Sequence, residues 1–173
     1  MRGVSLLAPQ DRTPPARPRA TLYSDAMAVN QEYAGRTMDA VGPYAVDAAL
    51  ISAFARAVGA TDPVHFDADA ARAAGYRDVV APPTLAVRFD QLASRAFIED
   101  PDAGVDYSRV VHGEQRFVHH RPITAGDEVS AQSTVDAIRS AGGHSMITVR
   151  SEITAAGEPV ATTYSTIVVR GGE

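Results

Sequence analysis

The second half of this 173-residue chain contains four runs rich in β-branched residues, and they constrain the fold more than any other feature. Turn-forming stretches such as "RPITAGD" and "SAGGH" separate the runs, which alternate partly between apolar and polar residues and cover 109–120, 128–139, 145–154 and 159–170. This spacing is typical of consecutive strands joined by tight turns. We therefore expect the last three runs to form an antiparallel meander.

Helical periodicity is found in the first half of the chain. Three helices are predicted there, after a short strand at 44–46, and they cover 48–59, 68–75 and 85–98. Asp47 and Asp67 are good N-caps for the first two. The third is the longest, has an apolar stripe and follows two prolines, which suit a first helical turn. The whole pattern predicts an α+β fold in which a curved antiparallel sheet wraps one long central helix.

The N-terminal segment has a composition unlike the rest. Residues 1–26 alternate prolines with arginines and show no periodicity, so we expect a disordered tail. Met27 is an alternative start, which would make the segment before it an over-long gene prediction. The remaining 27–173 are expected to form a single folded domain.

Composition excludes several classes of function. The chain has no cysteine, so thiolate catalysis, disulfides and cysteine-bound metals are excluded. Its formal charge of −5 argues against binding to duplex DNA. No apolar run approaches the roughly 20 residues of a membrane span. These features fit a cytoplasmic protein, and we expect no cofactor.

Three segments carry a resemblance to a known family. They are "VGATDPVHFDADAARAAGYRDVVAPPT" (58–84), "GVDYSRVVHGEQRFVHHRPITAGDEV" (104–129) and "ITAAGEPVATTYSTIVVRG" (153–171). Together they resemble the hot-dog fold of MaoC-like (R)-specific enoyl hydratases and (R)-3-hydroxyacyl dehydratases. The likeness is greatest to the small actinobacterial HadA and HadC subunits and their uncharacterised relatives, and it covers about 30–170.

The resemblance implies a catalytic loop at 59–65. Active members place an Asp and a His there, and the pair carries out the proton transfers of a syn elimination. In this chain Pro63 and His65 match the family pattern, but Ala60 stands at the position of the catalytic Asp. Asp62 stands where the family has Asn, and it is the candidate substitute for the missing acid.

The resemblance also implies an oxyanion site at the start of the central helix. Active members stabilise the thioester oxygen there with the backbone N–H of a glycine. Here the equivalent residue is Pro83, which has no N–H to donate. The substrate-binding residues implied by the resemblance are Ala81, Pro83, Thr84, Leu85 and Phe89.

The expected function is that of the substrate-binding, catalytically incomplete half of a dehydratase. It would act on an (R)-3-hydroxyacyl thioester of acyl-carrier protein (ACP) or CoA in fatty-acid or related lipid elongation, as a heterodimer with a MaoC-type catalytic subunit. One alternative is a self-sufficient homodimeric hydratase that uses Asp62 and His65. Another is a non-enzymatic module that binds acyl thioesters.

Two other groups of residues need an interpretation. His112, Glu114, His119 and His120 share one predicted strand, but the adjacent histidines face opposite sides of a sheet, so we expect no metal site. Single arginines such as Arg88, Arg95 and Arg116 are candidates for steering a phosphopantetheine arm or an acidic carrier protein.

Overall fold

The computed structural model describes residues 29–171 of the chain. The predicted tail at 1–26 and the alternative start at Met27 lie outside this range and stay predictions. Five strands form one antiparallel sheet in the order β1-β3-β4-β5-β2. Their bounds are β1 Val41–Val46, β2 Val110–His119, β3 Asp127–Ala141, β4 His144–Ala155 and β5 Glu158–Val169.

Three α-helices accompany the sheet, namely α1 Ala48–Ala57, α2 Ala68–Ala73 and α3 Ala86–Ile98. The side chains of Asp47 and Asp67 accept hydrogen bonds from backbone N–H groups in the first turns of α1 and α2, as their sequences predict. Short 3-10 turns lie between the longer elements, at η1 Gln31–Tyr33, η2 Pro63–His65, η3 Pro83–Leu85, η4 Pro101–Ala103 and η5 Tyr107–Arg109.

The predicted meander is confirmed, because β3, β4 and β5 pair in sequence order. Gly142 and Gly143 form the β3–β4 turn with positive φ angles, which suits glycine in a tight hairpin. The β2 strand pairs with β5, the last strand, and so lies at the opposite edge of the sheet from β1. Among the described residues, its outer side has no strand partner.

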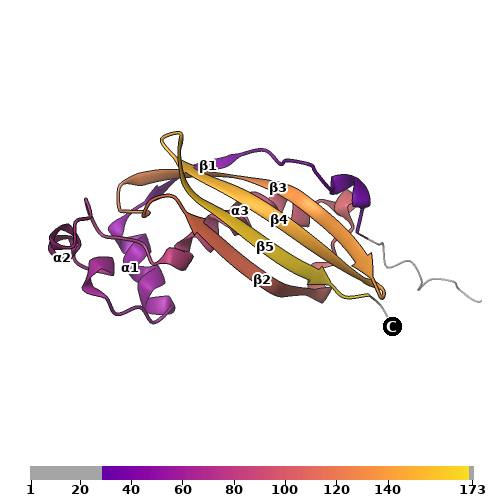
Figure 1. Cartoon of the computed structure of the whole chain (residues 1–173), viewed down its shortest axis with the longest axis horizontal. Coiled ribbons are helices and arrows are strands. Elements are labelled where there is room, and N and C mark those ends of the chain that lie inside the picture. The colour runs from indigo at the N-terminus through magenta and orange to yellow at the C-terminus, as the bar shows by residue number, and fades with distance from the viewer. Residues whose placement is uncertain (1–28, 172–173) are drawn as a thin grey trace, which may run out of the picture.

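The sheet curves around α3, and α1 and α2 lie beyond one end of it (Figure 1). The core between α3 and the sheet consists of two hydrophobic clusters. One contains Leu85 and Phe89 near the start of α3, and the other contains Phe97 near its end. These three side chains are fully buried, and each contributes roughly 2 kcal/mol to folding. The α+β hot-dog architecture expected from the sequence is therefore confirmed.

Candidate functional site

The candidate site is built where the loop after α1 meets the start of α3. The η2 turn carries His65, and the Asp62 side chain caps this turn by accepting a hydrogen bond from the Val64 N–H at 3.1 Å. The proline at the first position of the turn has no N–H to satisfy, which favours this geometry. The local sequence thus holds His65 on a short, well-defined turn.

His65 is bound directly to the segment that leads into α3. Its Nδ1 lies 2.7 Å from the carbonyl oxygen of Val80, and since a carbonyl can only accept, Nδ1 donates the hydrogen bond. In the neutral ring this leaves Nε2 with a free lone pair, the form that can accept a proton. The Val80 N–H in turn donates to the Val64 carbonyl at 3.0 Å, so two hydrogen bonds fix the two segments together.

From this contact the chain continues through Ala81 into η3 and then α3. The Ala81 N–H donates to the Ile123 carbonyl at 2.8 Å, and Pro83 opens the η3 turn that continues into α3. Pro83 and Thr84 are exposed, whereas Ala81 is buried. Leu85 and Phe89 are fully buried in the core, so a substrate-binding role for these two residues stays a prediction.

The two candidate catalytic residues are close in sequence, but the structure gives them separate partners. The Asp62 carboxylate binds the Val64 N–H, and the His65 ring binds the Val80 carbonyl. The backbone N–H of His65 donates to the Asp62 carbonyl at 3.1 Å, but no hydrogen bond joins the two side chains within the described part of the chain. At Ala60 the side chain is a methyl group, and its N–H donates to the Ala55 carbonyl at 2.9 Å.

An ion-pair cluster around the buried Asp127 adjoins the site through Thr124, which pairs with Val80, and the sequence interpretation missed it. The Asp127 carboxylate accepts hydrogen bonds from Arg121, from Arg77 at 2.6 Å and from the Thr124 N–H at 2.9 Å. Burial alone would raise the pKa of Asp127, but these hydrogen bonds and charges outweigh it and lower the pKa below its usual range. The "RPITAGD" stretch (121–127) contains Ile123 and Thr124, with which Ala81 and Val80 pair, and the ion pairs of Asp127 hold this stretch in place.

A second carboxyl group that sequence reasoning missed lies in α3. Asp90 is 2% exposed and accepts a hydrogen bond from Ser151 Oγ at 2.6 Å. Burial raises its pKa, against the opposing influence of the Ser151, Thr163 and Gln115 side chains and of His112. The signal was present in the sequence, because Asp90 falls on the same helical stripe as the buried residues Ala86, Ala93 and Phe97.

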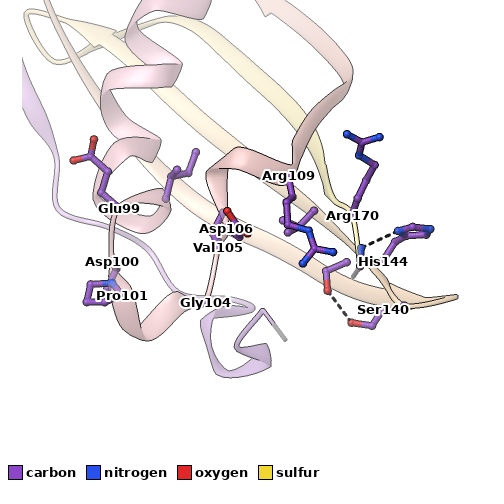
Figure 2. A pocket seen from close by; sticks show the side chains of 15 residues that line it. Glu99, Asp100, Pro101, Gly104, Val105, Asp106, Arg109, Ser140, His144 and Arg170 are labelled. Atoms are coloured by element: carbon purple, nitrogen blue, oxygen red, sulfur yellow. Dashed lines mark hydrogen bonds between the residues drawn. The ribbon is translucent and has the colours of Figure 1, made fainter. Parts of the chain in front are cut away.

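A pocket of about 470 Å³ lies at the far end of α3 from His65, between the helix end and the β3–β4 hairpin. Acidic and basic side chains both line it, and the guanidinium groups of Arg109 and Arg170 point in opposite directions (Figure 2). Asp100 accepts a hydrogen bond from the Tyr33 hydroxyl, which holds the pKa of this carboxyl below its usual value. Since its charges oppose one another, this pocket lacks the concentrated field that a charged ligand requires.

Comparison with known proteins identifies the family. A model described as "FAS1-like, dehydratase domain region" matches residues 32–163. The chain belongs to this family of FAS1-like dehydratase domains. Its curated relatives include a UPF0336 protein of Clavibacter michiganensis, which is 49% identical over 148 residues, or 85% of this chain and 99% of the relative. A UPF0336 protein of Saccharopolyspora erythraea is 49% identical over 146 residues, or 84% of this chain and 94% of the relative.

Solved structures place this FAS1-like dehydratase domain among MaoC-like proteins. The C-terminally truncated HadBC complex, a (3R)-hydroxyacyl-ACP dehydratase from Mycobacterium tuberculosis, matches with a TM-score of 0.68 and 28% identity. That match covers 79% of this chain and 96% of the other. A MaoC-like dehydratase matches with a TM-score of 0.74 and 34% identity, over 82% of this chain and 43% of the other. A dehydratase-type role is supported by both matches.

Within residues 29–171, no helix has the length and apolar character to cross a bilayer. The same range contains no group of three or more histidine or acidic side chains placed to hold a metal ion.

Proposed function

We propose that this chain is the substrate-binding subunit of an (R)-3-hydroxyacyl-thioester dehydratase of the HadA or HadC type. A MaoC-type subunit would supply catalysis, and the thioester would be that of ACP or CoA in fatty-acid or related lipid elongation. One observation carries the proposal. His65 is held on its turn by a hydrogen bond to the Val80 carbonyl, but the catalytic carboxyl and the oxyanion-binding N–H expected beside it are both absent from their positions. Ala60 has no proton to transfer, and Pro83 has no N–H.

The chemistry of dehydration explains why these two groups matter. The α-proton must leave, the β-hydroxyl must be protonated, and negative charge gathers on the thioester oxygen as this happens. A positioned acid–base group contributes about 10²–10⁴-fold to such a reaction, and loss of one oxyanion donor costs about 10²–10³-fold in turnover. Together these deficits favour a subunit that binds substrate and relies on a partner for chemistry.

The outer edge of β2, which has no strand partner among residues 29–171, offers a place for that partner. Val111 and Val118 of β2 are 45% and 37% exposed, and Tyr107 just before the strand is 70% exposed. An unpaired edge with apolar side chains favours pairing with another sheet. The HadBC dehydratase is itself a complex, which supports this arrangement by analogy.

A self-sufficient homodimeric hydratase is the second candidate, and the His65 geometry favours it. With Nδ1 donating to the Val80 carbonyl, Nε2 is in the form of a general base. Asp62 would then have to leave the Val64 N–H, which its carboxylate caps at 3.1 Å, in order to act as the acid. This requirement places the homodimer second.

Co-expression with a MaoC-type subunit separates these functions. We expect the co-purified complex to hydrate crotonyl-CoA, and the same complex carrying His65→Ala in this chain to keep most of that activity. If the chain were only a binding module, acyl-CoA would raise its melting temperature but no subunit would confer activity. The proposal would be contradicted if the chain failed to bind a MaoC-type subunit, or if it failed to bind acyl-CoA.

A further inference from the structure

A polar band interrupts the core beneath α3. It consists of Asp90 on the helix and, on the strands below it, Ser133, Ser151, Thr163 and Gln115. The register places Ser133 opposite Ser151 and Ser151 opposite Thr163, so the band crosses the sheet from β3 through β4 to β5. Gln115 extends it to β2, and the two hydrophobic clusters lie on either side.

Hydrogen bonding in the polar band is complete at one end and incomplete at the other. In the middle of the sheet, Ser133 Oγ donates to the Ala93 carbonyl at 2.9 Å, and Ser151 Oγ donates to Asp90. Towards the edge, Thr163 Oγ1 and both amide atoms of Gln115 are buried and have no hydrogen-bond partner among residues 29–171. Thr163 and Gln115 are near enough to influence the Asp90 carboxyl, but neither reaches hydrogen-bond geometry with it.

The incomplete end lies at the edge where a partner sheet would pair. Thr163 is fully buried on β5, and Gln115 is half-buried on β2, whose outer side is unpaired in the described residues. The neighbours Glu114 and Arg116 are exposed, so Gln115 is the polar residue of this strand that turns inward. Buried donors and acceptors are almost always satisfied in native proteins, which points to a group that joins the cluster in the working assembly.

The chemistry of the cluster selects an uncharged group. An amide and a hydroxyl present both donors and acceptors, which suits an alcohol that itself donates and accepts. No arginine takes part in the polar band, so an anionic group would lose its hydration without gaining a counter-charge there. Anionic groups such as phosphate are therefore poor matches for this end of the polar band.

We propose that Gln115 and Thr163, supported by Asp90, form a polar subsite that binds the hydroxyl group of a hydroxyacyl thioester. The inference rests on the proposed function and deepens it by assigning hydroxyl recognition to this chain. Gln115 reaches the ligand by rotation of its flexible side chain, because its amide is closed to solvent in the isolated chain.

Binding measurements on the full chain test the subsite. We expect calorimetry to show 3-hydroxyoctanoyl-CoA binding about tenfold more tightly than octanoyl-CoA, the effect of one good hydrogen bond. Gln115→Met keeps the side-chain length and removes both polar atoms, and Thr163→Val does the same for the hydroxyl. Each variant should bring the two affinities within about twofold by weakening the binding of 3-hydroxyoctanoyl-CoA. Ser133→Ala, at the other end of the band, should keep the tenfold preference.

Each outcome decides between the subsite and a purely structural polar core. Equal affinity of the wild-type chain for both thioesters, or a preference that survives both substitutions, would overturn the subsite while leaving the proposed function intact. Binding of neither thioester would overturn both proposals. If Gln115→Met fails to melt cooperatively, Thr163→Val provides the same comparison on a different strand.

Discussion

At the scale of single residues, two buried aspartates show how partners set the charge of a carboxyl group. Asp127 and Asp90 are 4% and 2% exposed, yet their pKa values shift in opposite directions. Asp127 is bound by two guanidinium groups, whereas burial dominates at the Asp90 carboxyl, which has only neutral side chains in contact with it. Folding therefore lowers the pKa of Asp127 and raises that of Asp90.

Asp127→Asn should destabilise the chain by about 2 kcal/mol, the value of charge-assisted hydrogen bonds lost from a buried acceptor. The pKa of Asp127 is lowered on folding, so its stabilising contribution is present above the unfolded pKa of about 3.9 and is lost as pH falls through the folded value. Urea denaturation should show the variant approaching wild type in acid. A gap in unfolding free energy that stays constant down to pH 2 would contradict this account.

Asp90→Asn should have the opposite pH dependence. The pKa of Asp90 is raised on folding, so its contribution is present below about pH 3.9 and is lost as pH rises through the folded value. Relative to the Asn variant, the free energy of unfolding of the wild type should fall as the pH rises above about 4. The exposed residue Asp39, changed to Asn, is the control and should show no such trend. A wild-type advantage that grows with pH would show that Asp90 is ionised in the fold.

At the scale of elements, the sequence predicted the number and order of helices and strands well. Local patterns decided them, because the caps of α1 and α2 and the glycine turn between β3 and β4 depend on neighbouring residues only. The pairing of β2 with β5 could not be predicted from the pattern. It joins residues about 50 positions apart, and nothing local distinguishes this partner for β2 from the next strand along the chain.

The free edge of β2 gives a prediction about assembly. Val111→Lys should convert the protein, or its complex with a MaoC-type subunit, into separate subunits, because a charge on a paired edge would be buried without a partner. Met146→Lys is the matched control, since Met146 is 47% exposed on β4, which has neighbours on both sides. Light scattering after size-exclusion chromatography would report the mass. Equal behaviour of the two variants would exclude β2 as the interface.

At the scale of the whole molecule, the candidate site was only partly visible in the sequence. The positions of Ala60, His65 and Pro83 followed from local patterns and family resemblance. The contact of His65 with the Val80 carbonyl did not, and neither did the Asp127 cluster behind it, because both depend on how distant segments pack. Asp90 was detectable in principle, as a charged residue on an otherwise apolar helical stripe.

Restoring the carboxyl at position 60 and the backbone N–H at position 83 should give this chain hydratase activity. The double variant Ala60→Asp and Pro83→Gly returns a carboxyl to the loop and an N–H to the start of α3. We expect it to hydrate crotonyl-CoA at least about 100-fold faster than wild type, because each group is worth about 10²-fold or more. His65→Ala in this background should abolish the gain. A gain that survives loss of His65 would show that the loop does not act as inferred.

The central claim is that this chain binds acyl thioesters without transforming them by itself. The most direct test is the steady-state hydration of crotonyl-CoA by the purified chain alone, followed through loss of enoyl absorbance. Our account predicts no rate above that of buffer and no difference between wild type and His65→Ala. Sustained turnover by the isolated wild-type chain, abolished by His65→Ala, would contradict it and would establish the self-sufficient hydratase instead.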